Sequence, residues 1–450
     1  MQTWRRSKAS PGRYAGEQPV FAYGSKDSAK RMQRQALRYI CLEESKQRQA
    51  EPAASPQQTL LRRQVCTIFT PEIKSIQYDR KMKIVADNTV PYLKGVAEAF
   101  ADVQYVAPGG FVRENIRDAD VLIVRSIDKC TQELLENTRV KLIATATIGF
   151  DHIDTAFCDK AGIRWVNAPG CNAASVGQYV LASLIVTARK TGELLAGKTL
   201  GIVGAGHVGT QVERLAEIFG LRVLRNDPPR ALRENDAAFV SLKTLAAEAD
   251  IVSVHTPLTR SGEFPTYHLA GREFFGSLRR RPWFINAARG PVHDTQALLE
   301  AKKQGQVSEL ILDCWENEPQ IDRELLQLAA VATPHIAGFS ADGKANGTRM
   351  CLEAIGRYYG LEVERIGRVT PPAPESPVID LDTFAGNRIE EAVLVTFDPR
   401  RVDRRLREAP DKFEYFRNHY DHPREFGAYT VRNARPEEMP VLEKLGFRTE

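Results

Sequence analysis

Thr199-Leu-Gly-Ile-Val-Gly-Ala-Gly-His-Val-Gly209 is the stretch of sequence that decides the fold. Its first five residues predict a buried β-strand, and a helix is expected from Val208 to about Phe219. The turn between them has the pattern Gly-x-Gly-x-x-Gly. In such a turn the glycines permit a tight bend, close approach of a pyrophosphate and close packing of helix on sheet. We therefore predict a dinucleotide at the N-terminus of this helix, with a binding loop made of Gly204, Gly206, His207, Val208 and Gly209.

The end of the next predicted strand indicates which dinucleotide is bound. Asp227 stands eighteen residues after Gly209, just behind a strand predicted at 222–225. A carboxylate at this position accepts hydrogen bonds from the adenosine ribose and repels a 2′-phosphate, which favours NAD over NADP. Arg230 is nearby and would suit a phosphate instead. The sequence therefore predicts NAD as the cofactor.

Alternating strands and helices on both sides of this motif indicate an α/β protein. Strands are also predicted at 83–86, 120–124 and 140–144, before a long helix at 175–190. The later strands are predicted at 222–225, 251–255, 283–286, 310–312 and 331–333. Two β-α series predict two Rossmann-like, doubly wound parallel-sheet domains with a ligand cleft between them.

We expect these domains to be followed by a small α+β domain. Residues 82–175 with 337–368 are expected to form a substrate-binding domain, and 176–336 the NAD-binding domain. A proline-rich linker then leads into 369–450, a segment rich in Arg and aromatic residues. Its composition suggests a role in interaction rather than in catalysis.

Residues 1–81 differ in composition from the rest of the chain. They hold 16 Lys and Arg against 7 Asp and Glu, whereas the remaining 46 basic residues face 50 acidic ones. Without apolar periodicity, this segment is expected to be disordered, or to precede a true start at Met82. An organelle-targeting peptide and a nucleic-acid-binding arm are the alternatives. No motif supports either alternative, so nucleic acid is not expected as a partner.

The composition argues against several classes of protein. An apolar content of 43% and a charged content of 26% are typical of soluble globular proteins. The longest apolar run, 179–188, is too short to cross a bilayer, and no secretion signal is recognised. The seven cysteines are scattered without a Cys-x-x-Cys pair, which predicts reduced thiols in the cytoplasm and no metal site.

Three polar side chains that follow separate predicted strands have the chemistry needed to oxidise a 2-hydroxy acid. Arg289 follows one strand, and a guanidinium there can grip a carboxylate through two hydrogen bonds. His335 follows another, and an imidazole suits a proton acceptor near neutral pH. Glu318 can stabilise the imidazolium formed when His335 takes a proton. Each residue alone would more often be structural, so the combination carries the prediction.

These residues resemble those of the D-isomer-specific 2-hydroxyacid dehydrogenases. The resemblance rests on the glycine loop with Arg289, Glu318 and His335, and extends from Met82 almost to the C-terminus. Other segments are most similar to the branch of the family that acts on 4-phosphoerythronate. They are Val124-Arg-Ser126, Thr145-Ala-Thr147, Ala168-Pro-Gly-Cys-Asn-Ala173, Asp227-Pro-Pro-Arg230, Asp313-Cys-Trp-Glu316, His335-Ile-Ala-Gly338 and Gly343-Lys344.

The resemblance implies that Arg289, Glu318 and His335 are catalytic, with His335 as the proton carrier. Ser126 and Thr147 would contact the substrate. The residues that it places around NAD are Asp227, Thr256, Ala287, Ala288, Arg289, Asp313 and Gly338. The implied reaction is the oxidation of 4-phospho-D-erythronate to (R)-3-hydroxy-2-oxo-4-phosphooxybutanoate in pyridoxine biosynthesis. The implied protein is a cytoplasmic homodimer that associates through its C-terminal domain.

Two departures from the family pattern bear on the substrate. Phe339 stands where a substrate-contacting Tyr is usual, which removes one hydrogen bond of about 0.5–1.5 kcal/mol. Phe150 replaces a small polar residue. Arg125, beside Ser126, is our candidate for holding the substrate phosphate. The alternatives are a sister enzyme acting on phosphoglycerate or another 2-hydroxy acid, and a non-enzymatic NAD-sensing corepressor of the same fold.

Overall fold

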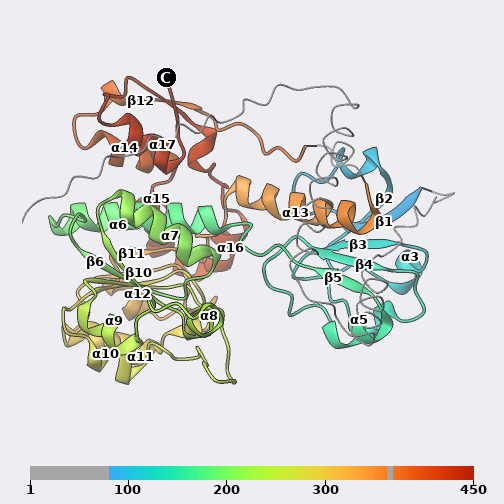
Figure 1. The fold of residues 1–450 in the computed structure, drawn as a ribbon, viewed down its shortest axis with the longest axis horizontal. Helices are drawn as coiled ribbons and strands as arrows, with labels where there is room; N and C mark the ends of the chain where they lie inside the picture. The colour runs from blue at the N-terminus through green and yellow to red at the C-terminus, as the bar shows by residue number, and fades with distance from the viewer. Residues whose placement is uncertain (1–80, 362–367) are drawn as a thin grey trace, which may run out of the picture. The chain divides into compact units, whose positions relative to one another are not determined.

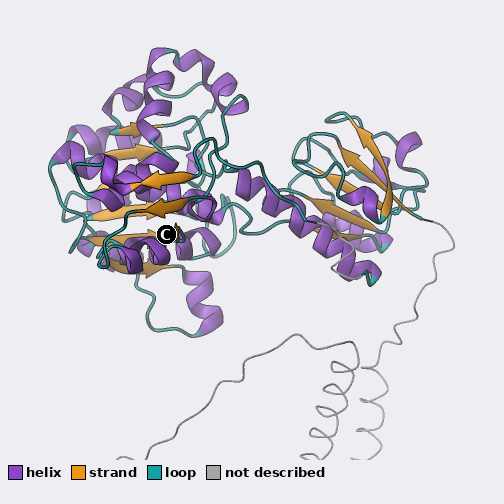
Figure 2. Ribbon diagram, turned by 90° about the horizontal axis from the view of Figure 1, so that it is seen from above, coloured by secondary structure: helices purple, strands orange, loops and turns teal. Residues whose placement is uncertain are grey.

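A computed structural model describes residues 81–361 and 368–450 of the chain. The predictions for 1–80 lie outside these described residues. The described chain contains two large parallel sheets, each with helices on its faces, and a small third sheet (Figures 1 and 2). Within the described ranges no helix has both the length and the apolar composition to cross a membrane.

The first sheet has five parallel strands in the order β2-β1-β3-β4-β5. Its strands are β1 (Met82–Asp87), β2 (Ala101–Val106), β3 (Val121–Val124), β4 (Leu142–Thr145) and β5 (Arg164–Val166). Its helices are η1 (Ala97–Ala99), α3 (Arg113–Ile116), α4 (Gln132–Leu135), α5 (Thr155–Ala161) and the later α13 (Ala341–Tyr359). Helix α13 buries Cys351, Leu352 and Ile355 against this sheet, so the chain returns to its first domain after completing the second.

Two strands of the first sheet, β2 and β5, were not predicted. They are its two edges, and β2 has the exposure pattern of a strand with polar side chains between apolar ones. Strand β5 is three residues long and none of them is fully buried. Short or polar edge strands lack the continuous apolar run that marks a buried strand.

The second sheet has six parallel strands in the order β11-β10-β9-β8-β6-β7. Its strands are β6 (Thr199–Val203), β7 (Arg222–Asn226), β8 (Ile251–Val254), β9 (Trp283–Asn286), β10 (Leu310–Leu312) and β11 (Val331–Ala332). Its helices are α6 (Ala173–Thr191), α7 (His207–Ile218), α8 (Pro228–Glu234), α9 (Leu242–Glu248), α10 (Arg272–Ser277), η2 (Gly290–Val292), α11 (Thr295–Lys303) and α12 (Arg323–Leu328). The predicted strands of this part are present, with ends that differ by one residue at most.

The register of the second sheet brings its carboxyl ends together. Val203 pairs with Val254, Val254 with Asn286, Asn286 with Leu312, and Leu312 with Ala332. The residues that follow these strands therefore lie along one edge of the sheet, where ligands bind in open parallel sheets. Every predicted catalytic residue is in a loop that begins at this edge.

The C-terminal residues form a three-stranded parallel sheet with helices around it. The strands are β12 (Val378–Asp380), β13 (Thr430–Arg432) and β14 (Arg448–Thr449). The helices are η4 (Leu381–Thr383), α14 (Arg388–Thr396), α15 (Pro399–Glu408), η5 (Pro410–Lys412), α16 (Phe413–Asn418), η6 (Phe426–Ala428) and α17 (Met439–Leu445).

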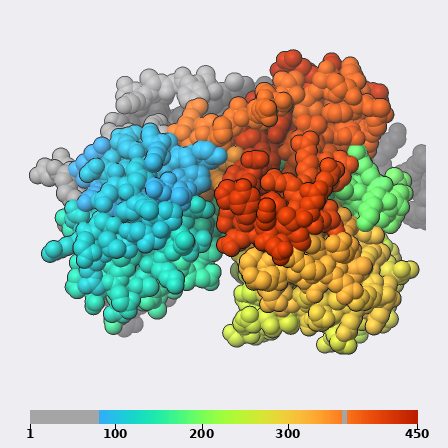
Figure 3. Space-filling model, turned by 180° about the vertical axis from the view of Figure 1, so that it is seen from behind, coloured from blue at the N-terminus to red at the C-terminus, as the bar shows by residue number. Residues whose placement is uncertain are grey.

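The C-terminal domain and the second sheet's domain share their hydrophobic cores. Ala392, Val393 and Phe397 belong to the same buried cluster as residues of α6. Leu406 and Phe413 belong to the cluster on the other face of the sheet. In Figure 3 the orange-red C-terminal residues lie against the yellow residues of the second sheet's domain. The C-terminal domain is therefore fixed in place beside the carboxyl edge of this sheet.

Candidate active site

Two adjoining cavities lie at the carboxyl edge of the second sheet. The larger has a volume of about 400 Å³ and takes residues from the loops after β3 and β4 as well as from the second sheet's domain. The smaller, of about 270 Å³, lies over the glycine loop. Residues that line both cavities are Ile148, Asn172, Arg289, His335, Gly338 and Phe339. Ligands in the two cavities would therefore contact some of the same residues.

The glycine loop has the backbone geometry that its pattern predicts. Gly204 has φ +92°, in the left-handed region that favours glycine. A Cβ on Gly209 would lie 2.2 Å from the carbonyl oxygen of Gly204, whereas a Cβ on Gly206 would meet nothing within 4 Å. Helix α7 begins after Gly206 without a side-chain cap or an acidic residue in its first turn. Its first N–H groups are therefore available to an anion.

Replacing Gly209 by alanine should weaken cofactor binding. The added methyl group can be accommodated only if α7 moves away from the Gly204 turn, because the contact is with a backbone oxygen. We expect the Kd for NAD to rise by about 10- to 100-fold, equivalent to losing one or two hydrogen bonds to phosphate. Calorimetric titration with NAD measures the effect. Gly276→Ala is the matched control, since a Cβ there has free space; equal Kd values for the two variants would contradict the assignment.

The smaller cavity is lined by most of the residues predicted to bind NAD. They are Gly206, His207, Val208, Thr256, Ala287, Ala288, Arg289, Asp313 and Gly338. Three further polar atoms in its wall are buried without a hydrogen-bond partner: Asn172 Oδ1, His255 Nδ1 and Thr256 Oγ1. Buried polar groups are normally satisfied, so this wall fits a ligand with its own donors and acceptors. A dinucleotide with a carboxamide and two riboses has that chemistry.

Asp227 lies beside the glycine loop rather than in the wall of the smaller cavity. Its Oδ2 accepts from the N–H of Ala205 at 2.9 Å, and its Oδ1 caps α8 by accepting from the N–H of Arg230 at 3.0 Å. Each carboxylate oxygen can accept a second bond, so both remain able to bind ribose hydroxyls. The Arg230 guanidinium is directed to the carbonyl oxygen of Ala205 and to Glu234.

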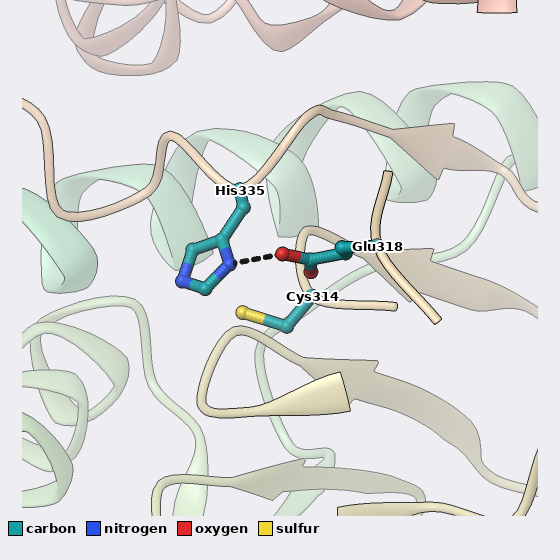
Figure 4. Close-up of side chains that lie close together, drawn as sticks. All are labelled: Cys314, Glu318 and His335. Atoms are coloured by element: carbon teal, nitrogen blue, oxygen red, sulfur yellow. Dashed lines mark hydrogen bonds and ion pairs between the residues drawn. The ribbon is translucent and has the colours of Figure 1, made fainter. Parts of the chain in front are cut away.

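His335 and Glu318 form a hydrogen-bonded pair at the cavities (Figure 4). Nδ1 of His335 lies 2.8 Å from Oε2 of Glu318, and the other carboxylate oxygen accepts from the N–H of Trp315 at 2.8 Å. An ionised carboxylate only accepts hydrogen bonds, so in the neutral imidazole Nδ1 carries the hydrogen and Nε2 has the lone pair. His335 lines both cavities. The pair therefore presents a proton acceptor to whatever occupies them.

Asp313 holds the loop that carries His335. Its Oδ1 accepts from Ile336 N at 2.8 Å and from Thr333 Oγ1 at 2.6 Å, and its Oδ2 accepts from Ala337 N at 2.9 Å. His335 itself has φ +56°, an uncommon conformation for a residue with a Cβ. Burial raises the pKa of the Asp313 carboxyl, while His335 and these hydrogen bonds act against the shift. The bonds explain how a strained histidine keeps one orientation.

Cys314 completes a group of three potential metal ligands with Glu318 and His335, whose ligand atoms lie within 4.8 Å of one another (Figure 4). Burial raises the pKa of the Cys314 thiol well above its usual value, so the thiolate that metals bind is disfavoured. Nδ1 of His335 is already used in the bond to Glu318. These contacts favour a proton-carrying pair over a metal centre.

Arg289 lies in the wall shared by the two cavities. One of its guanidinium nitrogens, Nη1, donates to the carbonyl oxygen of Ala288 at 2.8 Å. The next residue, Gly290, packs so closely that a Cβ would overlap the carbonyl oxygen of Trp315. Trp315 also donates to Glu318, so one residue connects the arginine loop with the glutamate. The structure thus brings the three predicted catalytic residues to one place.

The predicted substrate residues Arg125, Ser126, Thr147 and Phe339 all line the larger cavity. The hydroxyl of Thr147 donates to the carbonyl oxygen of Gly149 at 2.9 Å and contacts Thr145 Oγ1 at 2.6 Å. Nη1 of Arg125 donates to Thr89 Oγ1 at 3.0 Å. The Phe150 ring packs in a tilted arrangement against Trp165, with ring centres 4.8 Å apart, and Phe150 is not among the residues that line the cavity.

Several residues of the larger cavity were not predicted to be part of a site. They include His152, Asn172, Lys344 and Arg417. The sequence does mark Lys344, because Gly343-Lys344 is one of the segments that resemble the family. Nothing in the sequence indicates that its side chain faces the cavity. Arg417 lies in α16 of the C-terminal domain. In the sequence it is one of several arginines, and no motif distinguishes it from the others. Its place in the cavity follows from tertiary packing.

Comparisons with known proteins identify the family of the chain. Residues 176–337 match the family described as D-isomer specific 2-hydroxyacid dehydrogenase, NAD binding domain, and 372–446 match a domain of unknown function. The chain is 52% identical to a Porphyromonas gingivalis protein named erythronate-4-phosphate dehydrogenase, over 81% of this chain and 100% of that one. A Pseudomonas putida protein of the same name is 38% identical, over 81% of this chain and 99% of that one.

Two solved structures have a similar fold. NAD-bound 3-phosphoglycerate dehydrogenase from Entamoeba histolytica is 27% identical, with a TM-score of 0.50 over 63% of this chain and 99% of that one. A Thermus thermophilus protein is 28% identical, with a TM-score of 0.52 over 62% of this chain and 98% of that one.

Proposed function

Since the chain belongs to the D-isomer-specific 2-hydroxyacid dehydrogenase family, in its erythronate-4-phosphate dehydrogenase branch, we propose that Arg289, Glu318 and His335 carry its reaction. The reaction is the NAD-dependent oxidation of 4-phospho-D-erythronate to (R)-3-hydroxy-2-oxo-4-phosphooxybutanoate, in pyridoxine biosynthesis. The observation that carries the assignment of roles is the 2.8 Å bond between His335 Nδ1 and Glu318 Oε2 at the wall of both cavities.

In this proposal each of the three side chains has one task. The Arg289 guanidinium binds the substrate carboxylate and so orients C2 toward the smaller cavity. Nε2 of His335 takes the proton of the C2 hydroxyl, and the Glu318 carboxylate stabilises the imidazolium that results. NAD bound at the glycine loop would supply the acceptor for the hydride that leaves C2. The remaining residues around the smaller cavity hold the cofactor and exclude water.

A substrate panel tests the proposed function. The full chain is mixed with NAD and 4-phosphoerythronate, 3-phosphoglycerate or unphosphorylated erythronate, and NADH formation is followed by absorbance. Each assay is repeated with a 2-oxo acid present, so that reduced cofactor retained by the protein is reoxidised and the product accumulates. We expect the highest kcat/KM with 4-phosphoerythronate. A preference for 3-phosphoglycerate would indicate the sister enzyme, and absence of turnover with every acid would favour a cofactor-sensing protein.

We also propose that the protein is a cytoplasmic homodimer formed through the C-terminal domain. Val378 and Val395 in that domain are 40% and 46% exposed, which leaves apolar surface for a partner. The described cysteines are all free, in keeping with a reducing compartment. Light scattering of the full chain measures the oligomeric state; a monomer at micromolar concentration would contradict the dimer.

A further inference from the structure

Three cationic side chains from separate parts of the chain meet at the larger cavity. Arg125 follows β3 of the first sheet, Lys344 lies in the first turns of α13, and Arg417 lies in α16 of the C-terminal domain. Two of them lie over the ring of Phe339: Lys344 Nζ is 5.3 Å from the ring centre, and the Arg417 guanidinium carbon is 5.9 Å from it. His422 stacks on the same ring at 6.0 Å.

None of these three cations forms an ion pair within residues 81–361 and 368–450. Among the described residues the Arg125 guanidinium donates to Thr89 alone, and the Nε of Arg417 is buried with no hydrogen-bond partner. The contrast with Arg424 is clear, because that neighbouring arginine is paired with Asp342 at 2.8 Å. Asp151 is the one carboxylate that also lines the cavity. The cluster is thus left with an excess of positive charge.

Keeping such charges close together without counter-ions is unfavourable. Burial, and then repulsion from Arg125, lower the pKa of Lys344 to about 8. The pKa of His422 falls to about 4, chiefly because it is buried and also because Lys344 and Arg125 are near. An anion bound among these groups would act in the opposite direction and raise both pKa values. Guanidinium and ammonium groups together are the usual partners of a phosphate group, which offers several acceptor oxygens.

The position of Arg417 is set by the anchoring of the C-terminal domain. The guanidinium of Arg407 in α15 donates to the carbonyl oxygens of Leu326 and Ala329 at 2.6 and 3.0 Å. Asp403 accepts from the N–H of Ala332 in β11 at 2.7 Å. Phe413, at the start of α16, is 1% exposed in the core beside the second sheet. These contacts fix α16 and direct Arg417 into the cavity.

We propose that Arg125, Lys344 and Arg417 bind the phosphate group of the substrate, so that the C-terminal domain supplies part of the substrate site. This inference rests on the proposed function, because it assigns the phosphate end of a substrate whose carboxylate is bound by Arg289. The C-terminal domain would then contribute to specificity for the phosphorylated substrate, independently of any role in the association of two subunits.

The test compares a phosphorylated substrate with its unphosphorylated counterpart. The quantity measured is the ratio of kcat/KM for 4-phosphoerythronate to kcat/KM for erythronate. We expect Arg417→Gln and Lys344→Gln each to lower this ratio by about 10- to 100-fold, because that is the usual contribution of a charge-assisted hydrogen bond. Lys344→Arg should restore most of the ratio, since it keeps the charge. Arg404→Gln, an exposed arginine of α15, is the matched control and should leave the ratio unchanged. A ratio in Arg417→Gln equal to that in Arg404→Gln would overturn the role of α16.

Titration with inorganic phosphate separates this inference from the proposed function. Calorimetry with the full chain and NAD should show phosphate binding that Arg417→Gln and Lys344→Gln weaken by about 10-fold or more. If the wild-type chain oxidised no 2-hydroxy acid but bound phosphate in this way, the proposed function would fail and the anion site would stand. If it oxidised the phosphorylated acid while the variants bound phosphate as tightly as Arg404→Gln, only the site assignment would fail.

Discussion

Replacing His335 by alanine is expected to lower kcat for 4-phosphoerythronate by roughly 10²–10⁴-fold, the usual contribution of a positioned acid–base group. The imidazole is the one group at both cavities whose free nitrogen, Nε2, can take a proton while Nδ1 is held by a carboxylate. Without it the hydroxyl proton must go to water. Steady-state kinetics measure the loss, and calorimetry should show that NAD still binds with nearly its original Kd.

The control for this prediction is His419→Ala, which removes an exposed histidine of the C-terminal domain. A second comparison uses Glu318→Ala, alone and together with His335→Ala. Because Glu318 acts through His335, the double variant should be little worse than His335→Ala alone, so the two losses should not add. Additive losses, or near-normal kcat in His335→Ala, would remove the pair from the mechanism.

Replacing Arg289 by glutamine should lower kcat/KM for 2-hydroxy acids by roughly 10²–10⁴-fold. The guanidinium is expected to form two charge-assisted hydrogen bonds to the substrate carboxylate, each worth about 1.5–3 kcal/mol. Arg289 lies where the two cavities meet, so its loss also frees C2 of the substrate from its orientation toward the cofactor. Both KM and kcat should therefore change.

Arg289→Lys distinguishes geometry from charge. A lysine keeps the charge but cannot form the paired, parallel hydrogen bonds of a guanidinium, so it should recover only part of the lost kcat/KM. Arg279→Gln, at an exposed position of the same domain, is the control for a general loss of positive charge. Full activity in Arg289→Lys would show that a point charge is sufficient, and a loss confined to the Kd of NAD would make Arg289 a cofactor residue alone.

The cofactor site and the catalytic residues could be predicted because they depend on local sequence and on a rule about parallel sheets. Gly204 to Gly209 encode a turn between a buried strand and a helix, in which Gly204 has a positive φ and Gly209 leaves no room for a Cβ. Arg289 and His335 each follow a short apolar strand, and in a parallel sheet such strand ends lie at one edge whatever their distance in sequence. Recognising the strands was therefore enough to expect these side chains near one ligand.

Other features depended on contacts that no local pattern encodes. The edge strands β2 and β5 have mixed or partly exposed side chains, so their pairing with the sheet, rather than their composition, makes them strands. The Asp313 carboxylate accepts three hydrogen bonds from the His335 loop and holds that loop in place. The sequence predicted only a cofactor contact for this residue.

Arg417 shows most clearly what tertiary structure alone decided. In the sequence it is one arginine among many in a basic and aromatic segment, far from every motif of the site. It reaches the cavity because Phe413 is buried against the second sheet's domain and α15 is bonded to the end of β11. Local sequence thus determined the strands, the glycine turn and the chemistry placed after each strand. Packing between the domains decided which distant cations reach the active site. The free energy of burying apolar surface that drives this packing is gained only when the two surfaces meet.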